Sequence, residues 1–265
     1  MRSLPFFGAK EGLPVHDAIV ISDLHLGSDN CEARSLRRFL EEIMHGELRT
    51  RRLILNGDVF DSIDFRRLKR HHWKVLSILR KLSDKIEICW INGNHDGPAE
   101  IISHLLGVHV QDEMILESGG RRILLHHGHR FDEFIDSHPI LTAIADAIYR
   151  LLQKIDKSHR FAKLAKSKSK TFLRCASKIE TRSIELAHKL GCDAVMCGHT
   201  HHAVANLSGP ISYYNSGCWT EKPCHYLTVR DGTVQLEEFS AVEVELPELE
   251  IARTETYSSR IAVPA

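Results

Sequence analysis

Carboxylate and histidine side chains fall in five short stretches, and each stretch directly follows an apolar run. The first holds Asp23 and His25, and the last holds His199 and His201 in "VMCGHTHH" (195–202). The other three are "GDVFD" (57–61), "GNHD" (93–96) and "HG" (127–128). If the apolar runs are strands, every stretch lies where a strand meets a loop, and open α/β sheets bind ligands at the carboxyl ends of their strands. The sequence therefore predicts that the five stretches converge on one site.

The side-chain types in these stretches suit divalent metal ions. Carboxylate, amide and imidazole ligands without thiolate favour Mn²⁺, Fe²⁺, Zn²⁺ or Co²⁺. Residues i and i+2 of a strand point to the same side, so Asp23 can share an ion with His25, and His202 should point away from His201. The candidate ligands are enough for two ions if one carboxylate bridges them. They are Asp23, His25, Asp58, Asn94, His127, His199 and His201.

The elements that must position these residues alternate in type along the first half of the chain. Apolar runs at 17–23, 51–58 and 85–96 read as buried strands, and amphipathic stretches at 31–44 and 72–85 read as helices. Hairpins are expected around Gly119-Gly120 and Asp231-Gly232, and a strand at 193–198. This alternation predicts a layered α/β fold with a largely parallel first half. Residues 130–190 interrupt it and are predicted to form a helical cap insertion, with helices at 138–155 and 170–191.

The domain prediction has three parts: a flexible N-terminus at 1–16, one domain at 17–243 that carries the cap, and an ill-ordered tail at 244–265. Lysine plus arginine balance aspartate plus glutamate at 35 each, so no overall charge points to a partner. The seven cysteines form no C-x-x-C pair, which argues against a disulfide framework and favours reduced thiols in the cytoplasm. We see neither a signal peptide nor an apolar run of membrane-spanning length.

The five stretches, in this order, resemble the motif series of the calcineurin-like metallophosphoesterase superfamily: D-x-H, G-D-x-x-D, G-N-H-D, H-G and G-H-x-H. The resemblance spans about residues 19 to 217 and implies an αββα sandwich. It implies one ion bound by Asp23, His25, Asp58 and His201, and a second bound by Asp58, Asn94, His127 and His199, so that Asp58 bridges. His95 resembles the family's catalytic histidine, and Asp96 its orienting partner.

Within that superfamily, "ISDLHLG", the insertion after "HHGHRFD", and "YYNSGCWTE" resemble the UDP-2,3-diacylglucosamine pyrophosphatase-type branch, which acts in lipid A synthesis. The resemblance implies a lipid-linked nucleotide diphosphate as substrate. Two motifs depart from that branch. His95 stands where its best-known members have arginine, and His129 stands where they have aspartate.

The chemistry follows from charge. Two divalent ions, with Mn²⁺ favoured, together with Asp23, Asp58 and a bridging hydroxide leave a small net positive charge, which selects an anionic phosphoryl group. Such a pair of ions activates a shared water for in-line attack on phosphorus. A protonated His95 would stabilise the leaving oxygen.

The remaining polar residues have plainer expected roles. Asp61 is expected to support a ligand rather than to bind metal, His126 to face away from the ions, and Cys197 to be buried. His129 is open between a substrate contact and a support. From Arg150 to Lys178 there are ten Lys or Arg and one acid, Asp156. That run is either a solvated helix face or a binding surface. As a binding surface, it would use Lys166 and Lys170 to contact the phosphate groups of a substrate or the inner face of a membrane.

Two other functions remain open at this point. A nuclease or a cyclic-nucleotide phosphodiesterase could use the same dinuclear centre, and a basic cap also suits nucleic acid. A non-catalytic scaffold on this fold would be expected to lack ligands, and none is missing here. The oligomeric state is left open by the sequence.

Overall fold

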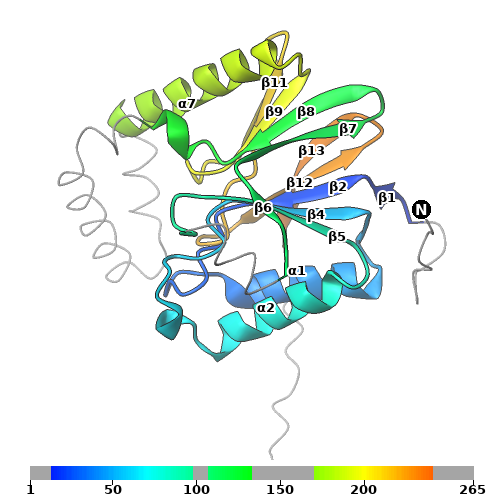
Figure 1. Cartoon of the computed structure of the whole chain (residues 1–265), viewed down its shortest axis with the longest axis vertical. Helices are drawn as coiled ribbons and strands as arrows, with labels where there is room; N and C mark the ends of the chain where they lie inside the picture. The colour runs from blue at the N-terminus through cyan, green and yellow to red at the C-terminus, as the bar shows by residue number, and fades with distance from the viewer. Residues whose placement is uncertain (1–12, 98–106, 133–169, 241–265) are drawn as a thin grey trace, which may run out of the picture.

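Two β-sheets face each other in the computed structural model, which describes residues 13–97, 107–132 and 170–240 (Figure 1). The six-stranded sheet has the order β13-β12-β2-β4-β5-β6, and the five-stranded sheet has the order β10-β11-β9-β8-β7. The first contains β2 (Ala18–Ile21), β4 (Arg52–Asn56), β5 (Glu87–Ile91), β6 (Val110–Gln111), β12 (Cys224–Arg230) and β13 (Thr233–Phe239). The second contains β7 (Glu113–Ser118), β8 (Arg121–His126), β9 (Ala194–Cys197), β10 (Val204–Asn206) and β11 (Ser212–Asn215). Strands β1 (Val15–His16) and β3 (Arg49–Thr50) form a small separate pair.

Helices cover the outer face of each sheet. Helices α1 (Ala33–His45) and α2 (Arg70–Leu82) lie on the six-stranded sheet, and α7 (Lys170–Lys189) lies over the five-stranded sheet (Figure 1). Two short 3₁₀ turns, η1 (Phe65–Arg67) and η2 (His129–Phe131), complete the described helical elements. In order, the layers are helix, sheet, sheet and helix, so the predicted αββα sandwich is confirmed.

Strict alternation of side chains explains why four layers form. Ile19 and Ile21 of β2 pack with the two N-terminal helices, whereas Val20 between them packs against the other sheet. Likewise Met196 of β9 lies between the sheets, and Val195 faces α7. Strands that are apolar on both faces are buried on both sides, as is expected for the inner strands of such a sandwich.

Both sheets send the carboxyl ends of their parallel strands to one edge of the sandwich. Strands β2, β4, β5 and β6 run parallel, as predicted, and β8, β9 and β11 do the same in the other sheet. The hairpins turned by Gly119-Gly120 and by Asp231-Gly232 are also confirmed. Every one of the five motifs therefore begins one or two residues after the last residue of a strand.

The predicted cap at 130–190 falls mostly on residues 133–169, which lie outside the described residues together with the predicted helix at 138–155. Residues 170–189 form α7, whose Ile184 and Ala187 pack on the five-stranded sheet as an outer layer of the sandwich. The predicted flexible N-terminus and tail also lie largely outside the described residues. Among the helices that are described, none is long and apolar enough to cross a membrane.

Candidate metal centre

The five loops converge, as the sequence predicts. Within the described residues, three overlapping groups of potential ligand atoms each lie within 4.8 Å of one another. They are Asp23 with His25 and His201, His25 with Asp58 and His95, and Asp58 with His127 and His199. Because the groups share His25 and Asp58, they form one continuous cluster.

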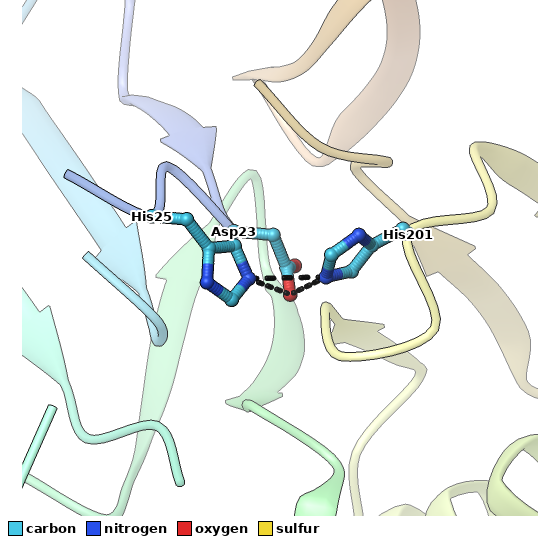
Figure 2. A group of neighbouring side chains, drawn as sticks. All are labelled: Asp23, His25 and His201. Carbon is cyan, nitrogen blue, oxygen red and sulfur yellow. Dashed lines mark hydrogen bonds and ion pairs between the residues drawn. The ribbon is translucent and has the colours of Figure 1, made fainter. Parts of the chain in front are cut away.

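The first group draws on the two ends of the motif series. Figure 2 shows the rings of His25 and His201 turned toward the carboxylate of Asp23 from opposite sides. The Nε2 atoms of the two rings lie 3.1 Å apart, and Asp23 Oδ1 lies 3.1 Å from the His201 nitrogen and 4.0 Å from the His25 nitrogen. Three potential ligand atoms therefore surround one small volume.

The carboxylate of Asp58 joins this group to the next. Its Oδ2 atom lies 3.7 Å from Nε2 of His25 and 3.3 Å from Nε2 of His127. On the far side, Nδ1 of His199 lies 3.1 Å from Oδ1 of Asn94. All seven predicted ligands thus lie close together, and Asp58 occupies the central position.

The backbone at these positions departs from strand geometry. Six residues other than glycine have positive φ in the described part of the chain, and five are candidate ligands: Asp23, His25, Asp58, His199 and His201, with φ between 47° and 66°. Strand β2 ends at Ile21, so Asp23 and His25 lie in the loop after it. They do come together, as predicted, but the expected reason, alternation of side chains in a strand, is wrong. Left-handed backbone costs about 1–3 kcal/mol per residue and gathers at functional sites, which supports a functional reading of the cluster.

Two glycines make room for the cluster. A Cβ atom on Gly57 would collide with the ring of His127, and a Cβ on Gly93 would collide with the backbone nitrogen and carboxylate of Asp58. The glycines in these motifs are therefore needed because the ligand side chains pass against the backbone of the neighbouring loop.

The hydrogen bonds of His127 leave one nitrogen suited to a metal. Its Nδ1 lies 2.9 Å from the carbonyl oxygen of Asn56, and a carbonyl only accepts, so Nδ1 carries a proton. The buried Nε2 atom lies 3.3 Å from Oδ2 of Asp58 but makes no well-aligned hydrogen bond. When the ring is neutral, that nitrogen presents a lone pair next to Asp58, which is the arrangement of a metal-binding histidine held by a backbone carbonyl. The residues present therefore fit a divalent ion.

The electrostatics of the metal-free site point the same way. Burial alone would raise the pKa of Asp23 and lower that of His127. Instead, the nearby histidines His201 and His127 bring the pKa of Asp23 down to about 2. The carboxylates of Asp58 and Asp23 bring the pKa of His127 up to about 10. A bound cation would compensate the negative charge of these buried carboxylates.

His95 and Asp96 differ from the expected pairing. The Nδ1 atom of His95 lies 3.0 Å from the carbonyl oxygen of Asp61, and its backbone N–H donates to Asp58 Oδ1. The buried carboxylate of Asp96 instead accepts from the backbone of Phe60 and Gly93 and from the indole of Trp90. Asp96 therefore shapes the "GNHD" loop, and the partner of the His95 ring is a backbone carbonyl.

Asp61 lies beside a candidate ligand, where the sequence predicts a supporting carboxylate. Its Oδ1 atom lies 3.5 Å from Nδ1 of His25, on the side of the ring away from the cluster, and its other oxygen pairs with Arg67. The carboxylate can hold the His25 ring with Nε2 toward Asp58, which is the usual role of an acid behind a metal-binding histidine.

The other predicted residues divide into near and distant ones. The His129 ring lies 5.5 Å from that of His127, and its buried Nδ1 has no hydrogen-bond partner. His126 and Cys197 are buried together on the α7 side, and His202 is exposed, all as expected. Lys166 lies outside the described residues, and Lys170 is the first residue of α7, so their substrate roles stay predictions.

Several supporting residues were not predicted. Asn56 spans the sheets by donating to the carbonyls of His126 and Met196. Asn215, in the "YYNSG" stretch, donates 2.6 Å to the carbonyl of Gly198 and so holds the "GHTH" loop. The carboxylate of Asp132 lies 3.0 Å from Nε2 of His199. None has a local signal beyond being polar near a motif, because each acts on a loop far away in the sequence.

Comparison with known proteins decides the family. A family model described as calcineurin-like phosphoesterase matches residues 17–203. This chain belongs to the calcineurin-like phosphoesterase family. Among curated protein sequences, none matches it significantly.

Solved structures of similar fold come from enzymes and from sorting proteins. YfcE, a phosphoesterase from E. coli, is 17% identical, with 84% of this chain and 99% of that chain covered and a TM-score of 0.46. An archaeal phosphodiesterase is 15% identical, with 83% and 98% covered and a TM-score of 0.43. Vps29 from Entamoeba histolytica, solved with Zn²⁺, is 16% identical, with 84% and 99% covered and a TM-score of 0.40.

Proposed function

We propose that this calcineurin-like phosphoesterase hydrolyses a phosphoester or diphosphate bond with two divalent ions, with Mn²⁺ favoured. The observation that carries the proposal is the place of Asp58, which is 2% exposed and whose Oδ2 lies 3.3 Å and 3.7 Å from histidines of two different ligand groups. One carboxylate can therefore serve two ions. When bound, such ions activate water and neutralise phosphoryl oxygens.

His95 is the residue of this chain best placed to handle a proton at the leaving oxygen. The carbonyl of Asp61 fixes the proton on Nδ1, so Nε2 is the ring atom left to act on substrate. The side chain is partly exposed, and its ring centroid lies 5.0 Å from that of His25. A protonated ring in this position can donate to the oxygen that leaves phosphorus.

For the substrate, we propose a lipid-linked nucleotide diphosphate like UDP-2,3-diacylglucosamine. The motif resemblance to that branch supports it, and so does the exposed face of α7. There, Arg174, Lys178 and Arg182 recur every four residues beside the exposed Leu173, and they line a hollow of about 420 Å³. A face that combines cations with an apolar side chain suits an anionic amphiphile, and we propose that it also lets a cytoplasmic protein rest on the inner membrane face.

The test compares three substrates on Mn²⁺-loaded protein: UDP-2,3-diacylglucosamine, bis(p-nitrophenyl) phosphate and single-stranded nucleic acid. We expect the highest kcat/KM for the first. Faster hydrolysis of nucleic acid would make the chain a nuclease. Metal binding without hydrolysis of any of the three would favour a non-catalytic scaffold.

A matched variant tests the role of His95. His95→Ala should keep the metal content of the wild type and lower kcat by about 10²–10⁴, the usual contribution of a general acid or base. If the variant lost an ion instead, His95 would be a metal ligand. Its place beside His25 and Asp58 in one of the three ligand groups would explain that result.

A further inference from the structure

We infer that Asp132 is a positioning residue for the metal centre: its carboxylate fixes the ring of His199 so that Nδ1 of that ring faces Asn94. The inference rests on the metal centre proposed above. It adds a residue that lies outside the five motifs and that contacts the ring edge of His199 opposite Asn94.

The geometry places Asp132 and Asn94 on opposite edges of one imidazole. Oδ2 of Asp132 lies 3.0 Å from Nε2 of His199, and Oδ1 of Asn94 lies 3.1 Å from Nδ1. The side chains of His199 and Asp132 are only 8% and 13% exposed, so water competes little for this pair. The ring is therefore held at both nitrogens.

The chemistry of the partners decides which nitrogen carries the proton. An ionised carboxylate only accepts, so Nε2 of His199 must donate to Asp132. In the neutral ring, Nδ1 then presents a lone pair toward Asn94 Oδ1, which presents lone pairs as well. Two acceptor atoms 3.1 Å apart suit a cation that both of them bind. Without Asp132, the proton could move to Nδ1 and the ring could donate to Asn94 instead.

The turn after β8 explains why Asp132 arrives there. Gly128 has φ 107°, and the 3₁₀ turn closes with hydrogen bonds from Phe131 N to the carbonyl of Gly128 and from Asp132 N to that of His129. The same loop accepts a hydrogen bond at His127 O from Gly198 N, so it is tied directly to the loop of His199. One turn thus positions the candidate ligand His127 at its start and, at its end, the Asp132 carboxylate that contacts a second candidate ligand.

Asp132 acts through His199 and does not join the ligands themselves. It belongs to none of the three ligand groups found among the described residues, and its contact is with the nitrogen that points away from Asn94. This arrangement of carboxylate, histidine and metal orients a ligand and raises its basicity, and loss of the carboxylate typically costs 10–100-fold in metal affinity.

The test measures binding of Mn²⁺ by calorimetry to the wild type and to Asp132→Ala, Asp132→Asn and Glu113→Gln. Glu113 pairs with Arg130 of the same turn at 2.6 Å and does not touch His199, so its variant removes a carboxylate without removing this contact. We expect Asp132→Ala to lower the affinity for one ion by about 10–100-fold and to leave the other within about twofold. Asp132→Asn should lose less, since its amide oxygen still accepts from Nε2.

Proton placement gives a readout that a merely structural role would not move. In metal-free protein, where no ion fixes the tautomer, nitrogen NMR of the neutral His199 ring should show the proton on Nε2 in the wild type and in Glu113→Gln, and a larger share of it on Nδ1 in Asp132→Ala. Unchanged affinities in Asp132→Ala would overturn the inference, and so would equal loss of both ions with a lower Tm. Wild-type protein that binds no Mn²⁺ would instead refute the proposed metal centre, and the inference with it.

Discussion

His126 and His127 are neighbours in the sequence and equally buried, at 1% exposed each, yet their surroundings are opposite. The His126 ring faces the α7 layer, where its Nε2 lies 3.5 Å from the Cys197 sulfur and its Nδ1 has no hydrogen-bond partner. The His127 ring lies between the carbonyl of Asn56 and the carboxylate of Asp58.

The difference shows that burial alone does not decide the charge of a histidine. Burial, helped by the charge of Arg130, lowers the pKa of His126 to about 3. His127 is just as buried, but Asp58 and Asp23 outweigh its desolvation and raise its pKa to about 10. Alternation at the end of β8 thus sends one imidazole into an apolar layer and the next into the candidate metal centre.

The largest expected effect comes from removing the carboxylate that sets the two histidines apart. Asp58→Ala should lose both ions, because the Asp58 carboxylate lies next to His25 on one side and His127 on the other, and the activity of the variant should fall by more than about 10³. In the metal-free variant, the pKa of His127 should also move down toward that of His126. Elemental analysis and an NMR titration measure the two effects. Retention of two equivalents of Mn²⁺ would show that Asp58 is not the bridge.

The same substitution at the two neighbours makes the comparison direct. His127→Leu removes a candidate ligand and should weaken binding of one ion by more than about 100-fold, since even residues behind a ligand cost 10–100-fold. Equilibrium dialysis with Mn²⁺ measures the affinity, and the hydrolysis rate at saturating metal follows it. Undiminished binding would remove His127 from the ligand set.

His126→Leu should behave differently. It replaces a buried ring that has an unpaired nitrogen with an apolar side chain, so stability should change by less than about 1.5 kcal/mol. Metal content and kcat should stay within about twofold of the wild type. Thermal unfolding and the metal assay check both statements. A loss of metal as large as that of His127→Leu would mean that the two faces are not independent.

The smallest effect concerns a third buried histidine, His72, which is not one of the candidate ligands. Burial, together with His71 and Lys69, lowers the pKa of His72 from 6.5 to about 4. The unfolded chain therefore binds this proton more readily, and the stability that the neutral ring contributes is present above pH 6.5 and lost as the pH falls toward 4. His72→Gln keeps an acceptor for the backbone N–H of Lys69 but does not titrate.

We therefore expect the Tm of the wild type to fall more steeply between pH 6.5 and pH 4 than that of His72→Gln, while the two curves run parallel above pH 7. Calorimetric scans at several pH values give both curves. Parallel curves over the whole range would mean that the His72 ring is hydrated in solution.

Much of this centre could be predicted because its signals are local. Each candidate ligand follows an apolar run by a few residues, and parallel strands bring their carboxyl ends to one edge, so the meeting of Asp23 and Asp58 follows from the order of strands in one sheet. His127 comes from the other sheet, and its approach also depends on how the two sheets pack. The alternation at His126 and His127 was predictable from a local signal too. The partner of His95 was not, because the carbonyl of Asp61 lies 34 residues away in the sequence and only loop geometry brings it to the ring.

By itself, the sequence determined the layered α/β fold and the candidate ligands at the strand ends, which follow from hydrophobic periodicity, and the resemblance of its motif series implied the four-layer sandwich. Only the tertiary structure decided the left-handed backbone of Asp23 and His25, the central place of Asp58, and the approach of Asp132 to His199. These depend on distances of a few ångströms between loops that lie far apart in the sequence. Periodicity indicates which face of an element a residue occupies, whereas a hydrogen bond between two loops depends on their positions in the folded structure.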